Sequence, residues 1–172
     1  MKRLLIGFGV IAFLLPQYCE GSPIDEIIKE TLNELEPFVP NNSVTKNLLK
    51  LTAAVESDYG KNTKNKSSIG VWQLTGTTIK YIEKQLCKNL ELYKSVDRLK
   101  TKSTEHYHAA LAIIYYGTRV NLFRIKIDDT PSNIEILTLA IIWKNEYNTW
   151  KGDGHPLIAY NKFKLYTERG LK

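Results

Sequence analysis

The sequence of 172 residues lacks the features that mark several protein classes. Cysteine is scarce, with two in the chain, so a framework of several disulfides is excluded. No apolar run reaches the roughly 20 residues that a membrane-spanning helix needs. There is no glycine-rich phosphate-binding loop, no Gly-x-Ser-x-Gly and no His-Glu-x-x-His. The common nucleotide-binding, serine-hydrolase and zinc-peptidase interpretations therefore lose their support.

The first residues have the pattern of a secretory signal. Lys2 and Arg3 precede an apolar run from Leu4 to Leu15, and small residues before Ser22 allow cleavage there. We predict a signal peptide over 1–21 and one domain over 22–172, exported to the periplasm or secreted, with no stable membrane span. Cleavage would leave Cys87 as the remaining cysteine, so the exported fold must be stabilised by its apolar core.

Composition supports a single packed domain. Hydrophobic residues make up 43% of the chain and charged residues 24%, which is the balance of an ordinary globular protein. The formal net charge of +6 favours approach to anionic surfaces. The lysines are scattered and fit a solvated face equally well, and we predict no nucleic-acid partner.

Apolar residues recur at helical spacing through most of the chain, and no alternating run is longer than a few residues. Asn42-Ser43, Ser103 and the Ser132–Glu135 pair have the chemistry of helix N-caps. The class we predict is all-α, or α with minimal β. The expected helices cover residues 24–35, 44–56, 78–87, 91–99, 104–120, 136–146 and 156–167.

The cysteine and the histidines give little indication of a nucleophilic or metal site. Cys87 has helical neighbours and is expected in the core, since free cysteine is among the most often buried residues. His106 and His108 are two residues apart, so on a helix they diverge and cannot share a metal ion. We expect them on the surface or at a helix cap. His155 follows Gly152-Asp153-Gly154, a sequence typical of a turn, with no ligand set nearby, and we predict no metal and no cofactor.

Glu56 stands out because it lies beside an apolar stripe at the end of its expected helix. A carboxyl there loses hydration, so its pKa rises and it can hold a proton near neutral pH, as a general acid must. Farther along, Gly70 permits close backbone approach to that carboxyl, and Gln73 offers a hydrogen-bonding amide. The alternative is an ordinary surface glutamate followed by a loop.

The order of these residues resembles the motifs of lytic transglycosylases, enzymes of the lysozyme superfamily that cut bacterial peptidoglycan. The resemblance covers about Leu48 to Tyr81 and rests on Glu56-Ser57, Gly70-Val71-Trp72-Gln73-Leu74 and Thr78. It implies a lysozyme-like fold that acts on peptidoglycan glycan strands, and a partner in an envelope-spanning secretion apparatus fits a chain of this size.

The resemblance also implies roles. Glu56 would be the single catalytic acid and base, with formation of a 1,6-anhydromuramyl end, and Asp58 cannot assist if the helix continues. Substrate-binding candidates are Ser57, Ser68, Gln73, Tyr147 and Asn148. The family tyrosine that bonds the catalytic glutamate has two possible registers here, Tyr147 or Lys144. A hydrolytic lysozyme on the same fold, or a non-catalytic module that binds glycan or a partner, are the alternatives.

Overall fold

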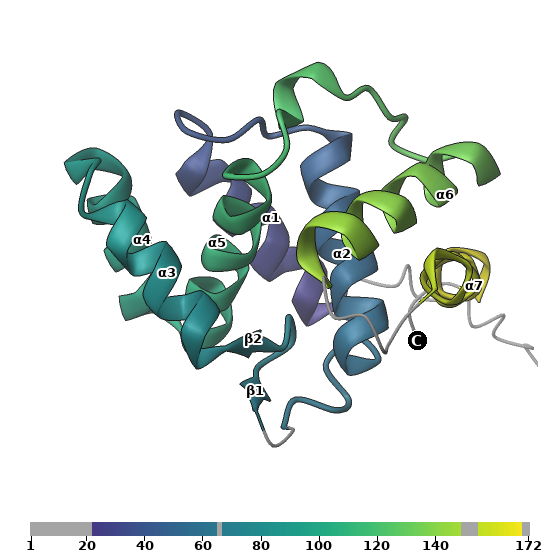
Figure 1. Cartoon of the computed structure of the whole chain (residues 1–172), viewed down its shortest axis with the longest axis horizontal. Helices are drawn as coiled ribbons and strands as arrows, with labels where there is room; N and C mark the ends of the chain where they lie inside the picture. The colour runs from purple at the N-terminus through teal and green to yellow at the C-terminus, as the bar shows by residue number, and fades with distance from the viewer. Residues whose placement is uncertain (1–21, 65–66, 149–154, 170–172) are drawn as a thin grey trace, which may run out of the picture.

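The protein is described by a computed structural model over residues 22–64, 67–148 and 155–169. The predicted signal peptide lies outside these ranges. Within them, helices follow one another with a single small hairpin (Figure 1). The elements are α1 (Pro23–Leu35), α2 (Ser43–Ser57), β1 (Ser68–Ile69), β2 (Leu74–Thr75), α3 (Gly76–Leu86), α4 (Leu90–Lys102), α5 (Thr104–Gly117), a 3₁₀ turn (Leu122–Arg124), α6 (Asn133–Ile142), a π-helical turn (Trp143–Tyr147) and α7 (Pro156–Arg169). The prediction of an all-α domain with minimal β is confirmed.

The helices begin where the capping residues predict. The Asn42 side chain accepts hydrogen bonds from the backbone at the start of α2, and Thr45 bonds back to the Asn42 amide. Ser103 caps α5 and Ser132 forms the predicted capping box with Glu135 at the start of α6. Each such bond satisfies a backbone N–H that has no partner within the helix.

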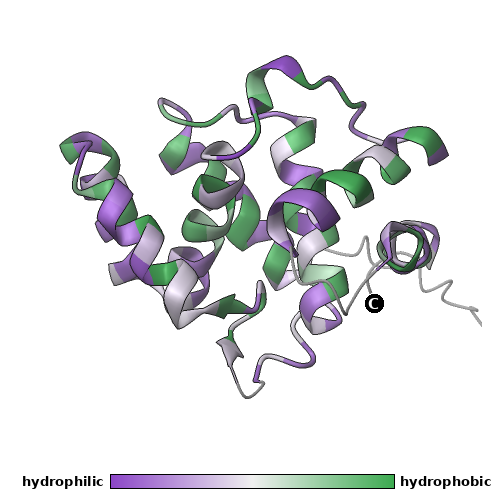
Figure 2. Cartoon of the chain, viewed as in Figure 1, coloured by the Kyte–Doolittle hydropathy of each residue, from purple (hydrophilic) through white to green (hydrophobic). Residues whose placement is uncertain are grey.

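The core is built around α2, which lies between α1 and α5 on one side and α6 and α7 on the other (Figure 1). Leu48, Leu49 and Leu51 are all fully buried, so α2 is covered on more than the single stripe that its spacing predicts. Apolar residues also line much of α6 (Figure 2). The core position of α2 fixes its last turn, and with it Glu56.

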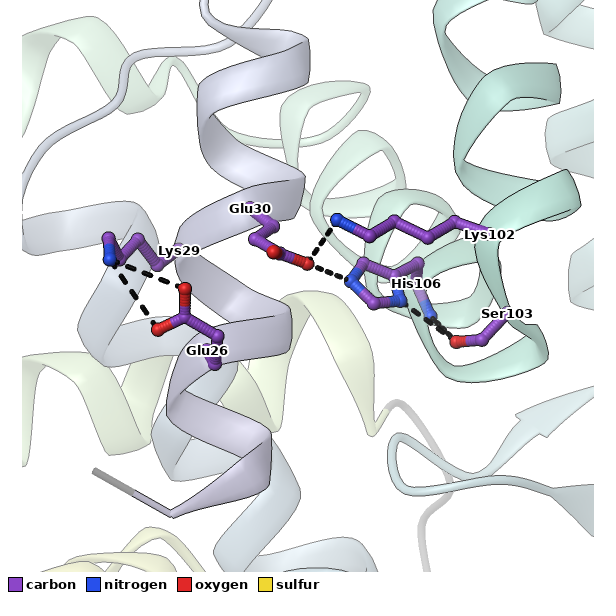
Figure 3. A network of polar contacts seen from close by, with 6 residues as sticks. All are labelled: Glu26, Lys29, Glu30, Lys102, Ser103 and His106. Atoms are coloured by element: carbon purple, nitrogen blue, oxygen red, sulfur yellow. Dashed lines mark hydrogen bonds and ion pairs between the residues drawn. The ribbon is translucent and has the colours of Figure 1, made fainter. Parts of the chain in front are cut away.

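A partly exposed polar network joins α1 to the end of α4 and the start of α5 (Figure 3). His106 Nε2 is 2.7 Å from Glu30 Oε2, and His106 Nδ1 is 2.8 Å from the Ser103 hydroxyl. Lys102 pairs with the same Glu30 carboxylate. Both imidazole nitrogens of His106 therefore have partners, which allows this side chain to be buried.

The expectations for Cys87 and His108 are wrong, and His106 takes one of its two expected roles. Cys87 is exposed, because α3 ends at Leu86 and its apolar face runs through Ile82 and Leu86, one position away from the cysteine. His106 and His108 are buried, with 7% and 4% of their surfaces exposed. The His106 backbone amide donates to the Ser103 hydroxyl at the start of α5. This is the helix-capping role, one of the two roles expected for His106. In the described ranges no helix has the length and apolar character needed to cross a membrane.

Candidate active site

Glu56 lies on the last turn of α2, where the helix is ended by two residues with left-handed backbone. Asp58 and Tyr59 have φ of 53° and 55°, which is uncommon for residues with a side chain. The Tyr166 hydroxyl of α7 donates to the Asp58 carboxylate. Asp58 is thus outside the helix, so the premise of a continuing helix is wrong, and its carboxylate is bound to α7.

The surroundings of Glu56 favour a protonated carboxyl. Burial raises the pKa of Glu56 above its ordinary value of 4.5. The Trp143 indole opposes this by donating to Glu56 Oε1 at 3.0 Å. A hydrogen bond from the Asn148 side chain and the charges of Lys162 and Lys144 also favour the ionised form. Burial outweighs these four effects, and the carboxyl is held in place by the Trp143 and Asn148 donors.

The Gly70–Gln73 turn joins β1 to β2, and its polar side chains hold it together. Ser68 donates to Gln73 Oε1 at 2.9 Å, and Gln73 Nε2 donates to the Gly70 and Asn62 carbonyl oxygens. Gln73 is 8% exposed and has a φ of 48°. The side chains of Ser68 and Gln73 therefore meet each other, and both serve the conformation of the turn.

Ser57 also serves the local backbone. Its hydroxyl donates to the Ala53 carbonyl oxygen at 3.0 Å and accepts from the Gly60 amide at 2.8 Å. The residue is 1% exposed. Of the residues expected to touch substrate, Ser57, Ser68 and Gln73 are thus placed as supports of the site. The close approach that Gly70 permits is to His108 of α5 rather than to the Glu56 carboxyl.

Tyr147 connects the turn to the end of α6. Its hydroxyl donates to the Trp72 carbonyl oxygen at 2.6 Å, and its ring stacks on Tyr116 at 5.0 Å between centroids. Burial raises the pKa of Tyr147 well above its ordinary value, so the phenol stays neutral. The charge of Glu56 acts on Tyr147, but the Tyr147 hydroxyl is hydrogen-bonded to the turn and not to this carboxyl.

The sequence leaves open whether Tyr147 or Lys144 contacts Glu56 in place of the family tyrosine, and the hydrogen bond comes from a third residue. Trp143, four residues before Tyr147, supplies the hydrogen bond to Glu56, and Lys144 acts on the carboxyl through its charge. Asn148 reaches Glu56 as well. Sequence reasoning missed Trp143 and Lys162. A signal for Trp143 was present, because it lies one turn from the tyrosine on the same helix, whereas nothing in the sequence pointed to Lys162.

The described residues contain no group of three or more His, Cys, Asp and Glu side chains arranged to hold a metal ion. Glu56 has the Trp143 indole, the Asn148 amide and the charges of Lys144 and Lys162 around it, and a carboxyl in such surroundings can take part in acid and base catalysis. Comparison of the chain with family models, with curated proteins and with solved structures finds no match in any of the three.

Proposed function

We propose that the protein is a lytic transglycosylase that cleaves the bond between N-acetylmuramic acid and N-acetylglucosamine in peptidoglycan. The observation that carries the proposal is the environment of Glu56. A single partly buried carboxyl with a raised pKa lies at the end of a core helix, where it accepts hydrogen bonds from the Trp143 indole and the Asn148 side chain. Tyr147, which feels the charge of Glu56, is bonded to the turn that carries the Gly-Val-Trp-Gln motif.

The proposed reaction needs one acid and base. Protonated Glu56 donates to the glycosidic oxygen as the bond from that oxygen to C1 of the muramyl sugar breaks. The muramyl 6-hydroxyl then attacks C1, and its proton passes to the Glu56 carboxylate, which regenerates the acid without consuming water. The attacking hydroxyl belongs to the substrate itself, so a second carboxylate that positions water is not required.

The surrounding residues have distinct tasks in this scheme. The Trp143 indole and the Asn148 amide orient the carboxyl and stabilise its negative charge after proton transfer. Lys144 and Lys162 act in the same direction by charge. Proton transfer by one positioned group contributes about 10² to 10⁴ in rate, so binding and distortion of the sugar must supply the rest.

The test is the mass profile of muropeptides released from purified sacculi by the wild type and by E56Q. The matched control is E91Q, which changes an exposed glutamate paired with Lys94. We expect anhydromuramyl ends, one water lighter than reducing ends, from the wild type and from E91Q, and none from E56Q. Reducing ends in place of anhydro ends would identify a hydrolytic lysozyme. Equal release by E56Q would overturn the catalytic assignment and leave a glycan-binding module.

We also propose that the protein acts after export, in the periplasm or outside the cell, where its substrate lies. A partner in an envelope-spanning apparatus would place such a small domain at the site where the wall must be opened. Cell fractionation with an antibody to the native protein tests the location, and an exclusively cytoplasmic protein would contradict it.

A further inference from the structure

His108 lies against the backbone of the turn that carries the Gly-Val-Trp-Gln motif. A Cβ atom added to Gly70 would be 2.4 Å from His108 Nδ1, so the imidazole occupies the space that a side chain would need. Glycine has a hydrogen in the direction of Cβ, and one Gly70 Cα–H bond therefore points at this nitrogen. His108 Nδ1 is buried and has no hydrogen-bond partner in the structure.

The contrast with His106 shows why this contact is unusual. His106 is on the same helix and is buried to a similar degree, but both of its nitrogens are hydrogen-bonded, to Ser103 and Glu30 (Figure 3). A second proton on His106 would keep both partners, because a hydroxyl and a carboxylate can each accept. A second proton on His108 would have a Cα–H group in front of it and no acceptor.

We infer that His108 is a positioning residue for the proposed reaction: its neutral imidazole, protonated on Nε2 alone, forms the surface on which the Gly70–Gln73 turn is built, and a second proton displaces the turn. The inference rests on the proposed function for its effect on rate. Its structural part, the coupling between His108 and Gly70, stands on the geometry.

Burial outweighs the charge that favours a positively charged His108. Burial lowers the pKa of His108 below its ordinary value of 6.5, and the opposing influence is Glu105 on its own helix. Of the nearby glutamates, Glu83 of α3 accepts from the Tyr107 hydroxyl, and Glu30 of α1 pairs with His106 and Lys102. The Gly70–Gln73 turn has no ionisable side chain.

Displacement of Gly70 would reach Glu56 through three hydrogen bonds and the backbone that joins them. The Gly70 carbonyl oxygen accepts from Gln73 Nε2 at 2.7 Å, and the Trp72 carbonyl oxygen accepts from Tyr147 at 2.6 Å. Tyr147 is in the same helical turn as Trp143, which donates to Glu56. Neutral His108 therefore supports the placement of the donors on the catalytic carboxyl.

The test combines a pH profile with a measurement that needs no activity. In the wild type we expect the rate of muropeptide release to fall by about tenfold per pH unit below the pKa of His108. H108N places an amide oxygen near the position of Nδ1 without a titrating group. We expect it to keep a rate close to that of the wild type near neutral pH and to lose the acid limb, which is the fall in rate at low pH. H106N, the matched control, should keep the acid limb. An unchanged acid limb in H108N would overturn the inference.

Nuclear magnetic resonance separates failure of this inference from failure of the proposed function. In ¹⁵N-labelled wild type and in E56Q we expect the Nε2–H tautomer for His108 at neutral pH, and a Gly70 amide signal that titrates with this imidazole. The Nδ1–H tautomer, or a Gly70 signal that does not follow His108, would refute the positioning role even if the protein is an active enzyme. The expected signals in a protein without activity would refute only the proposed function.

Discussion

Replacing Trp143 with phenylalanine tests how the pKa of Glu56 is set. The change removes the indole N–H that donates to Glu56 Oε1 at 3.0 Å and keeps an aromatic ring in the same position. A hydrogen bond to a charged group contributes about 1.5–3 kcal/mol. The bond favours the ionised carboxyl, and about 1.4 kcal/mol corresponds to one pKa unit. We therefore expect W143F to raise the pKa of Glu56 by about 1–2 units.

The sign of the change in activity follows from the proposed mechanism. Glu56 must be protonated to donate to the leaving oxygen, so the rate falls as the pH rises through its pKa. In W143F this alkaline limb should move to higher pH by the same amount. Asn148, Lys144 and Lys162 still favour the ionised form, so the shift is limited to the contribution of the indole. Initial rates of anhydromuropeptide release over a pH series measure it.

W72F is the matched control for loss of a buried indole. Trp72 is also buried, but its Nε1 donates to the Leu49 carbonyl oxygen at 3.1 Å and not to a carboxyl. Both variants should lower the melting temperature, since each leaves a smaller side chain in the core and removes a bond. Only W143F should move the alkaline limb. A limb that stays in place in W143F, or moves equally in both variants, would refute the account of Glu56.

Two further changes test stability at the same site. E56Q should raise the melting temperature above that of the wild type at alkaline pH but not at acid pH, because a folded-state pKa above the unfolded value contributes stability that is lost as the pH rises through it. Equal melting differences at both pH values would contradict this. G70A should lower the free energy of unfolding by about 2 kcal/mol or more in urea titrations, because φ is 82° and its Cβ would meet His108. Adding H108A to G70A should restore the part of the unfolding free energy that the clash removes and leave the loss due to backbone strain. If nothing is restored, the contact between Gly70 and His108 is contradicted.

The elements whose signals are local could be predicted from the sequence. Asn42, Ser103 and Ser132 bond to backbone amides two or three residues away, so the start of each helix is encoded beside it. The position of Glu56 at the end of α2 follows from the same local pattern. The ends of the helices depend on backbone conformation as well, and the left-handed Asp58 that stops α2 is held by α7, far along the chain.

The contacts that define the site could not be predicted in this way. Trp143 and Glu56 are 87 residues apart, and which side chain reaches the carboxyl depends on how α6 and the π-helical turn after it pack against α2. Lys162 acts from α7 for the same reason. The errors at Cys87 and His108 have a common cause, since spacing identifies the faces of a helix but does not say which neighbour covers each face.

The π-helical turn explains why neither expected register supplies the bond to Glu56. Over Trp143–Tyr147 the helix widens, and the Asn148 amide bonds to the Trp143 carbonyl oxygen, five residues back. Such turns insert one residue into an α-helix and occur frequently at functional sites. The inserted residue changes which side chains face α2, so Trp143 and Asn148 reach the carboxyl while Tyr147 reaches the Trp72 carbonyl oxygen. The hydrogen bond to the glutamate that the resemblance assigns to a tyrosine is made here by the Trp143 indole, and the Tyr147 phenol is bound to the turn.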